Sequence, residues 1–221
     1  MTEKVKPRRR YDSRRRREQA AQTRQDILAA AGTLFRERGY AGTSMTQIAT
    51  EAGVVVETIY RGFGSKRALF RAVMEAVLAG GTARGDAPVE ERPAIRAVID
   101  EPDPRRQIAL YVATQPGIHR RSGPLLRALR DGMASDPELK VVWDEMEAWR
   151  LVGQGRFVAM LADKGALRVG LSAEEARDVV WTLCSLAVHD LLIVERRWTS
   201  DRYQEWLARA LAGALLQDDR A

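Results

Sequence analysis

The chain has 221 residues, of which 45% are hydrophobic and 30% are charged, a length and composition typical of one sizeable folded domain or two modest ones. Its single cysteine, Cys184, cannot form a disulfide within the chain, and no N-terminal apolar stretch resembles a signal peptide, so we expect a cytoplasmic location. No uncharged run reaches the about 20 apolar residues that a membrane-spanning helix needs, which excludes an integral membrane protein.

The net charge of +6 is concentrated at the start of the chain. The first 24 residues hold ten Lys and Arg against three acidic residues, so the rest of the chain is close to neutral. We expect residues 1–20 to form a basic, disordered arm. Arginine-rich arms enter the minor groove of DNA and add affinity by counterion release, and the alternative is that the run of charge is a solvated tail. The arginines expected to contact DNA are Arg14, Arg15, Arg16 and Arg17.

A first helix is predicted from Thr23 to Arg38, because apolar residues recur there at spacings of three and four. Gly39 follows it and is typical of the residue that closes a helix. The apolar side of this helix is expected to brace the helices that follow. Its members are Ile27, Leu28, Ala31, Leu34 and Phe35.

Two short helices joined by a glycine turn come next. Ser44 and Gln47 form a capping box, in which the serine hydroxyl accepts from a first-turn amide and the glutamine side chain accepts from the amide of the cap residue. This predicts a helix that starts at Met45, and Gly53 suits the positive φ of the turn that ends it. A second helix is predicted from Val55 to Phe63. The pair, over about residues 44–63, matches a helix-turn-helix.

A longer helix is predicted to open at Ser65. The stretch after it, with Gly80, Gly85 and Pro88, indicates a flexible connection and a domain border. Beyond that border, prolines stand where first helical turns accept them, and they predict four helix starts. These prolines are Pro93, Pro104, Pro124 and Pro137.

The last third of the chain is also predicted to be helical. We expect one helix from Pro137 to Lys164, a second from Ala173 to about Arg197 behind a Ser172 and Glu175 capping box, and a final helix capped by Ser200. No alternating strand pattern is evident. We therefore predict an all-α protein of about nine or ten helices, with a three-helix helix-turn-helix domain over residues 21–81 and a larger helical domain over residues 82–221.

The helix from Ala173 is apolar around much of its circumference, so it must be covered on more than one side. Together with the final helix it is suited to form half of a four-helix interface about a two-fold axis, as in obligate dimers. The alternative is that both helices are central in a monomer. The residues predicted for the dimer interface are Val180, Ala187, Leu191, Val194, Trp206, Ala210, Leu211 and Ala214.

Aromatic and methionine residues of the second half are candidates for a pocket between helices, since small-molecule sites are mainly apolar with a few polar groups. The same spacing is also typical of plain core. His189, beside Asp190, is the polar candidate, whereas His119 is expected in a loop and has no companion ligand at metal spacing, so we expect no metal site. The pocket candidates are Tyr111, Trp143, Met146, Trp149, Phe157, Met160, Trp181, Cys184 and His189.

Many positions at fixed spacing in the first 80 residues resemble the DNA-binding domain of the tetracycline-repressor (TetR) family. The resemblance implies an all-helical homodimer that binds a palindromic operator in double-stranded DNA, usually as a repressor, and releases it when a small molecule, here an apolar one, occupies the C-terminal domain. The matching positions are Ile27 to Phe35, Gly39-Tyr40, Thr43-Ser44, Ile48-Ala49, Ala52-Gly53-Val54, Thr58-Ile59-Tyr60, Phe63, Ser65-Lys66 and Leu69.

A recognition helix presents its first residues to the bases of the major groove, so the start of the Val55 helix is expected to read sequence and its later residues to contact phosphates. Two residues depart from the family pattern. Val55 stands where a capping Ser is common, and Gly62 stands where a phosphate-contacting His or aromatic residue is frequent. The residues predicted to bind DNA, besides the arm, are Ser44, Thr46, Val55, Val56, Glu57, Thr58, Tyr60, Arg61 and Lys66.

Three classes of function compete. A DNA-binding regulator released by a small molecule accounts for the motif, the basic arm and the helical second half together. A DNA-binding regulator or activator without a small-molecule effector would share the first features. An enzyme is not expected, because no phosphate loop, nucleophile elbow or metal motif is present, and no cofactor is implied.

Overall fold

The computed structural model describes residues 9–79, 89–134 and 136–217. Within these ranges the chain is built of helices, and the one pairing of extended backbone is an isolated bridge between Leu167 and Leu216. The predicted all-α fold is confirmed, whereas the predicted Gly80, Gly85 and Pro88 connection lies outside the described residues. None of the helices in the described ranges combines the length and apolar content that a membrane crossing requires.

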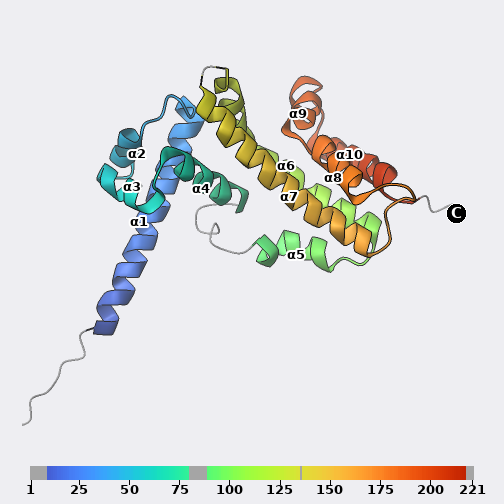
Figure 1. Ribbon diagram of the computed structural model, residues 1–221, viewed down its shortest axis with the longest axis horizontal. Coiled ribbons are helices and arrows are strands. Elements are labelled where there is room, and N and C mark those ends of the chain that lie inside the picture. Colours follow the sequence, from blue (N-terminus) through green and yellow to red (C-terminus); the bar gives the residue numbers. More distant parts are fainter. Residues whose placement is uncertain (1–8, 80–88, 135, 218–221) are drawn as a thin grey trace, which may run out of the picture.

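Helix α1 spans Arg9–Arg38 and is much longer than predicted. Figure 1 shows it extending well beyond the short helices that pack on its C-terminal half. The expectation of a disordered arm is therefore wrong for residues 9–20, while residues 1–8 lie outside the described ranges. The stretch before Thr23 is rich in Arg, Gln and Ala and has no Gly or Pro, so helix propensity carries the helix N-terminally of its apolar stripe. Gly39, at a φ of 71°, ends it as predicted.

The helix-turn-helix is present as predicted. Helix α2 is Met45–Glu51, and both halves of its capping box are formed: the Gln47 amide donates to Ser44 Oγ at 3.2 Å, and the Ser44 amide donates to Gln47 Oε1 at 2.8 Å. Gly53 has a φ of 65° in the turn. Helix α3, Val56–Phe63, follows.

Helix α4, Lys66–Ala79, completes the N-terminal bundle. Ser65 Oγ accepts from the Ala68 amide, so this residue caps α4 as predicted. The second half then begins with a short 3₁₀ turn, Val89–Glu91, and helix α5, Pro93–Asp100.

Two long helices form the middle of the protein: α6, Pro104–Gly132, and α7, Pro137–Asp163. Figure 1 shows them running side by side from the N-terminal bundle to the far end of the second domain. Three of the four predicted proline starts are confirmed, those of α5, α6 and α7. The start at Pro124 is wrong, because this proline lies inside α6. Proline deprives a helix of one amide donor, and the fully buried Leu125 and Leu129 continue the packing face past that defect.

The predicted helix from Ala173 to Arg197 is interrupted. Helix α8 spans Ala173–Leu183. It ends there because Ser185 caps a new helix, with its Oγ accepting from the Val188 amide at 3.2 Å. The chain continues as α9, Leu186–His189, and as the π-helical segment η3, Asp190–Glu195. The final helix α10 is Ser200–Leu215, and Thr199 rather than Ser200 caps it.

Two apolar clusters fill the protein. The first joins α1 to α4 with residues from α6 and α7, so it crosses the predicted domain border at residue 81. The second lies among α5 to α8 and α10. Because α6 and α7 contribute to both clusters, these two helices connect the N-terminal bundle to the far core.

Candidate nucleic-acid interface and polar core

Helix α3 has one fully buried residue, and half of its residues are exposed. Ile59 is fully buried, whereas Val55 is 64% and Tyr60 51% exposed. Glu57 and Arg61 are also exposed. A short amphipathic helix that shows mainly polar and charged groups to solvent, beside a second helix, has the geometry that enters a major groove.

The start of α3 lacks a side-chain cap, as predicted for Val55. Val56 is half-buried and packs against the first apolar cluster, so Val55 is better placed than Val56 for contact with a thymine methyl group. Thr58 is half-buried and faces α1. The predicted contacts at the beginning of α2, Ser44 and Thr46, are both exposed. The Ser44 hydroxyl is engaged in the cap of that helix.

A groove of about 500 Å³ separates α3 from the N-terminal half of α1. Gly62 is one of its lining residues, and a Cβ added there would meet no atom within 4 Å. Arg24 lies over the Phe63 ring, with its guanidinium carbon 4.5 Å from the ring centre. Cationic and amide groups thus converge on an open groove beside α3, a combination that suits phosphate oxygens. Its lining residues are Arg16, Gln19, Ala20, Thr23, Arg24, Ile27, Thr58, Arg61, Gly62 and Phe63.

Lys66, a predicted phosphate contact, begins α4 and lies against Tyr40. Its ammonium is 4.3 Å from the centre of the Tyr40 ring, and burial lowers the pKa of Lys66 while Asp136 and Glu138 raise it. The side chain therefore contacts a core tyrosine close to the acidic start of α7, and its phosphate contact stays a prediction. Desolvation, followed by the nearby Glu138 and Asp136 carboxylates, also raises the pKa of Tyr40 to about 12. Arg15, Arg16 and Arg17 of the predicted arm are exposed on helix α1.

Three of the predicted pocket residues belong to the junction between α4 and α7. Trp143, Met146 and Trp149 pack with the first apolar cluster, and the Arg71 guanidinium lies 4.1 Å from the Trp149 ring centre. Arg67 forms an ion pair with Glu145 at 3.8 Å across the same junction. These aromatic residues hold the two halves of the chain together, and the prediction that they line a pocket stays a prediction. Their spacing on α7 is the same for either role, which is why the pattern could not separate the two.

The remaining pocket candidates lie in or beside the second cluster. Tyr111 stacks on Phe157 with ring centres 3.9 Å apart. Met160 is half-buried and Cys184 is buried, and burial raises the pKa of the Cys184 thiol to about 12. Trp181 is 37% exposed and lies under the Arg150 guanidinium, so it is a surface residue.

Among the described residues of the second domain, His119, Gln154 and Tyr203 are buried and have polar atoms without a hydrogen-bond partner: both ring nitrogens of His119, Oε1 of Gln154 and Oη of Tyr203. Their exposed fractions are 5%, 3% and 0%. The His119 ring lies 4.6 Å from that of His189, which in turn lies 5.5 Å from the Tyr203 ring. Burial, then His189 and Arg150, lowers the pKa of His119 to about 3. His119 is therefore neutral and lies inside α6, so the prediction that it stands in a loop is wrong.

None of these three residues was among the predicted site residues. Gln154 had a usable signal, because it shares a helical stripe with Phe157 and Leu161 and is the polar member of that stripe. His119 had none, since its partner His189 is 70 positions away and no local spacing links them.

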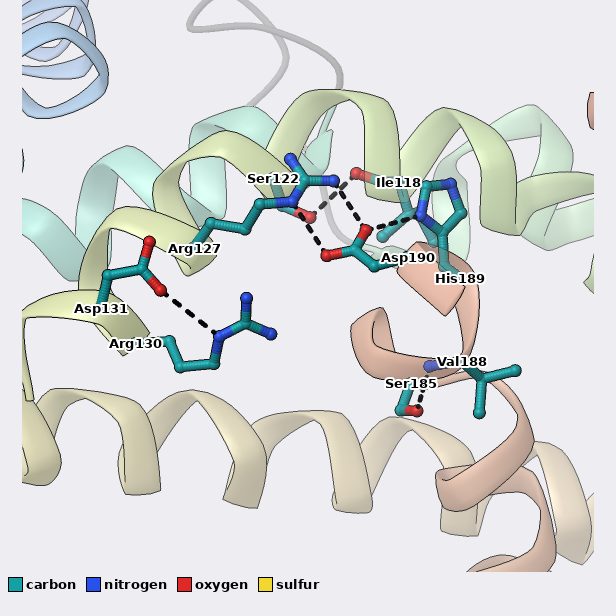
Figure 2. A network of polar contacts seen from close by, with 9 residues as sticks. All are labelled: Ile118, Ser122, Arg127, Arg130, Asp131, Ser185, Val188, His189 and Asp190. Carbon is teal, nitrogen blue, oxygen red and sulfur yellow. Dashed lines mark hydrogen bonds and ion pairs between the residues drawn. The ribbon is translucent and has the colours of Figure 1, made fainter. Parts of the chain in front are cut away.

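Asp190 connects this polar core to the surface (Figure 2). The Arg127 guanidinium donates from Nε and an Nη to the two Asp190 oxygens at 2.9 and 2.8 Å, and Asp190 Oδ1 is 3.1 Å from His189 Nδ1. Burial raises the pKa of Asp190, but the hydrogen bonds with Arg127 and His189 lower it by more. Outside this pair lies an open groove of about 460 Å³ lined by residues of α6, α9 and η3.

The predicted dimer residues divide into two sets. Val180 and Leu211 are fully buried in the second cluster of their own chain, so they cannot form an interface and that part of the prediction is wrong. Leu191 and Val194 of η3 are 51% and 57% exposed. Ala187 of α9 is also exposed, and Trp206, Ala210 and Ala214 on α10 are half-buried, which leaves an apolar surface on these three elements.

The chain is similar to known regulatory proteins. A family model described as bacterial regulatory proteins, tetR family, matches residues 27–73. The uncharacterized HTH-type transcriptional regulator YezE of Bacillus subtilis (strain 168) is 33% identical over 95 residues, which cover 39% of this chain and 49% of YezE. The HTH-type transcriptional repressor BepR of Brucella suis biovar 1 is 38% identical over 91 residues, which cover 41% of this chain and 40% of BepR. The chain thus spans about half, or less, of the length of these curated relatives.

Solved structures with the same fold cover most of the chain. NalD, the secondary repressor of the MexAB-OprM multidrug efflux pump in Pseudomonas aeruginosa, aligns with a TM-score of 0.66 at 24% identity over 90% of this chain and 99% of NalD. The transcriptional regulator FadR of Bacillus subtilis, solved in complex with stearoyl-CoA, aligns with a TM-score of 0.63 at 17% identity over 86% of this chain and 97% of FadR. At these identities the likeness is one of fold.

Proposed function

We propose that the chain is a transcriptional repressor of the TetR family, whose model matches residues 27–73, and that it binds a palindromic operator as a dimer and is released by a small molecule. The observation that carries this proposal is the open face of α3 next to the arginine-lined groove. Base-reading and phosphate-binding groups lie there on one side of the protein.

In this proposal α3 enters the major groove. Val55 just before it, and Glu57 and Tyr60 along it, are exposed, so base contacts come from the first residues and phosphate contacts from Tyr60 and Arg61. The groove beside α3 holds Arg16 and Arg24 on α1, which extends the cationic surface along the DNA backbone.

Dimerisation is proposed through α9, η3 and α10. The exposed Leu191 and Val194, together with Ala187, leave apolar area that a second copy would cover. A two-fold dimer presents two α3 helices in opposite directions, which is the reason to expect inverted half-sites in the operator.

Helix α6 offers a physical route between effector and DNA. It carries His119 in the polar core, and two residues further on Arg121 Nε donates to the Val77 carbonyl in the last turn of α4 at 2.9 Å. Leu125 and Leu129 of the same helix pack in the cluster that holds α1 to α4. A displacement of α6 by an effector would thus be passed to α4 and from there to α3. The alternative is a regulator without an effector. The close stacking of Tyr111 on Phe157 in the second core favours it, because no ligand fits between two rings in contact.

The proposal is tested by selecting bound duplexes from a random DNA pool with the full-length protein. We expect enriched sequences with two inverted half-sites, and an Arg61→Ala variant should retain much less of the same DNA. Enrichment of a single asymmetric half-site, or no enrichment at all, would contradict the proposal.

A further inference from the structure

The fold brings the two histidines of this chain into one site. His119 comes from the middle of α6 and His189 from the end of α9, and their rings are 4.6 Å apart and inclined by 37°. Although His119 is 95% buried, neither of its ring nitrogens has a hydrogen-bond partner. A buried imidazole without a hydrogen-bond partner is costly, so this position favours a ligand that supplies one.

Two further side chains add unpartnered polar atoms to this core. Gln154 of α7 has a free Oε1 and Tyr203 of α10 a free Oη, and both residues are more than nine-tenths buried. Tyr203 meets the His189 ring edge to face at 5.5 Å. Gln154 lies beside Tyr111, whose pKa burial raises while hydrogen bonds with the Gln154 and Gln115 side chains lower it. The core thus offers two hydrogen-bond donors, from the imidazole and the phenol, and acceptors on the imidazole and the amide.

The charged groups around this core are already paired. Asp190 is held by Arg127, and Arg150 by Glu147 and the Trp181 carbonyl oxygen. A charged ligand would therefore lose its hydration without gaining an opposite charge. A neutral ligand that both donates and accepts hydrogen bonds fits the groups present.

The surroundings of the unpartnered atoms are aromatic. Tyr111 and Phe157 form a stacked pair, and the rings of His119, His189 and Tyr203 follow one another in contact. We propose that His119, Gln154 and Tyr203 form a binding site for a neutral hydroxylated aromatic molecule, a phenol or naphthol in chemical class. This inference rests on the proposed function in that it names the class of effector for the second domain.

Entry of such a ligand requires α9 to move away from α6, because the two histidine rings are in contact. The approach of these elements is close: a Cβ added at Gly123 would lie 3.4 Å from Leu186 Cδ1 and 3.3 Å from the Arg127 guanidinium. Segment α9 is only four residues long and continues into the π-helical η3, a helix type often found at functional sites. A ligand between His119 and His189 separates α9 from α6. It thereby pushes on α6, the helix that also carries Arg121.

The test is a titration followed by histidine ring NMR. The full-length protein without DNA is labelled with ¹⁵N in its histidine rings, so that the spectrum reports on His119 and His189 alone. Three probes of the same shape are added at pH 7: 2-naphthol, which is neutral and has a hydroxyl; naphthalene, which lacks the hydroxyl; and 2-naphthoate, which is charged. We expect saturable shifts of both histidines with 2-naphthol, at least about fivefold weaker binding of naphthalene, and no saturable shift with 2-naphthoate. Unmoved histidine signals with 2-naphthol, or equal affinity for all three probes, would overturn the site.

Variants assign the recognition to individual groups. Tyr203→Phe and Gln154→Leu each remove one polar partner and should weaken 2-naphthol binding about fivefold or more, as should His119→Phe. Tyr40→Phe is the matched control, a buried tyrosine of the other core, and should bind as the unaltered protein does. Should His119→Phe fail to fold, Tyr203→Phe decides, because it keeps the ring that fills the core. Unchanged affinity in Tyr203→Phe and Gln154→Leu would overturn the assignment.

Failure of this site and failure of the proposed function give different results. If 2-naphthol leaves the histidines unmoved while the protein still binds its selected operator, the binding site is overturned and the DNA-binding role stands. If 2-naphthol shifts both histidines but does not release the operator, the site is supported and the effector part of the proposed function is contradicted.

Discussion

Arg121 Nε donates a hydrogen bond to the carbonyl oxygen of Val77 at 2.9 Å, which joins the middle of α6 to the last turn of α4. Carbonyl oxygens in the last turn of a helix have no partner within the helix, so this arginine satisfies an otherwise open acceptor at the border between the two halves of the chain. The side chain is half-buried, and burial, with Arg120 and Arg92, lowers its pKa. The contact makes the position of α4 depend on that of α6.

Replacing Arg121 by Ala should lower the free energy of unfolding by about 1–2 kcal/mol, because the substitution removes a charged hydrogen-bond donor from a half-buried carbonyl. Chemical denaturation of the full-length protein measures this change. Arg120→Ala is the control, since Arg120 is exposed, and it should stay within about 0.5 kcal/mol of the parent. Equal effects of the two substitutions would show that the Val77 contact contributes nothing.

Val55 precedes α3 as a cap residue without a side-chain acceptor. Val55→Ser supplies that acceptor and should raise the free energy of unfolding by about 0.5–1 kcal/mol, whereas Val55→Ala, which removes the same methyl groups, should give no such gain. Thermal unfolding of both variants at one pH separates the two. A destabilised Val55→Ser protein would mean that the valine packs within the domain.

The same residue is predicted to touch thymine. Replacing operator thymines by uracil should weaken binding of the unaltered protein by about 1 kcal/mol for each thymine methyl group that the valine touches, and this penalty should disappear in Val55→Ala. Fluorescence anisotropy on both duplexes measures the four affinities of this cycle. A uracil penalty that survives in Val55→Ala would assign the methyl contact to another residue.

The exposed arginines of α1 are predicted to contact phosphate. Changing Arg15, Arg16 and Arg17 together to Ala should weaken operator binding and reduce the slope of log affinity against log salt by about 0.9 for each phosphate that these arginines neutralise. Alanine preserves the helix, so the effect reports charge alone. Changing Arg96, Arg105 and Arg106 of α5 and α6 to Ala removes the same charge far from α3 and should leave the slope as it was. Equal slopes for the two triple variants would leave the arginines of α1 without a role in DNA binding.

The Arg127 and Asp190 pair predicts a pH dependence of stability. A carboxyl group whose pKa falls on folding stabilises the folded state above its unfolded value of about 3.9, and that stabilisation is lost as the pH falls from there through the folded pKa. The pKa of Asp190 is lowered in this way. The free energy of unfolding of Asp190→Asn should therefore fall less steeply below about pH 4 than that of the parent. Asp131→Asn, at an exposed pair with Arg130, should follow the parent curve, and a curve for Asp190→Asn that coincides with it would refute the coupling.

Much of the fold was predictable because its signals are local. The capping boxes of Ser44 and Ser172, and the helix-ending Gly39 and Gly53, act within four residues of chain, and all are present as predicted. Pro124 carries an equally local signal, which is overridden by the packing of α6.

The candidate sites were predictable only where one short helix determines them. The exposed face of α3 follows from its own residues, whereas the contact of Lys66 with Tyr40 depends on how α4 meets the rest of the bundle. The polar core brings His119 and His189 together from distant parts of the chain. The break at Ser185 that positions His189 lies in an apolar run whose composition favours one continuous helix. Such features arise from tertiary packing, which spacing along the chain does not encode.

The most direct test of the central claim is the stoichiometry of the complex with DNA. Native mass spectrometry of the full-length protein with its selected duplex should give two chains on one duplex, and a duplex that carries a single half-site should be retained far more weakly. One chain per duplex, with equal affinity for the single half-site and the complete sequence, would contradict the claim that the protein binds its operator as a dimer.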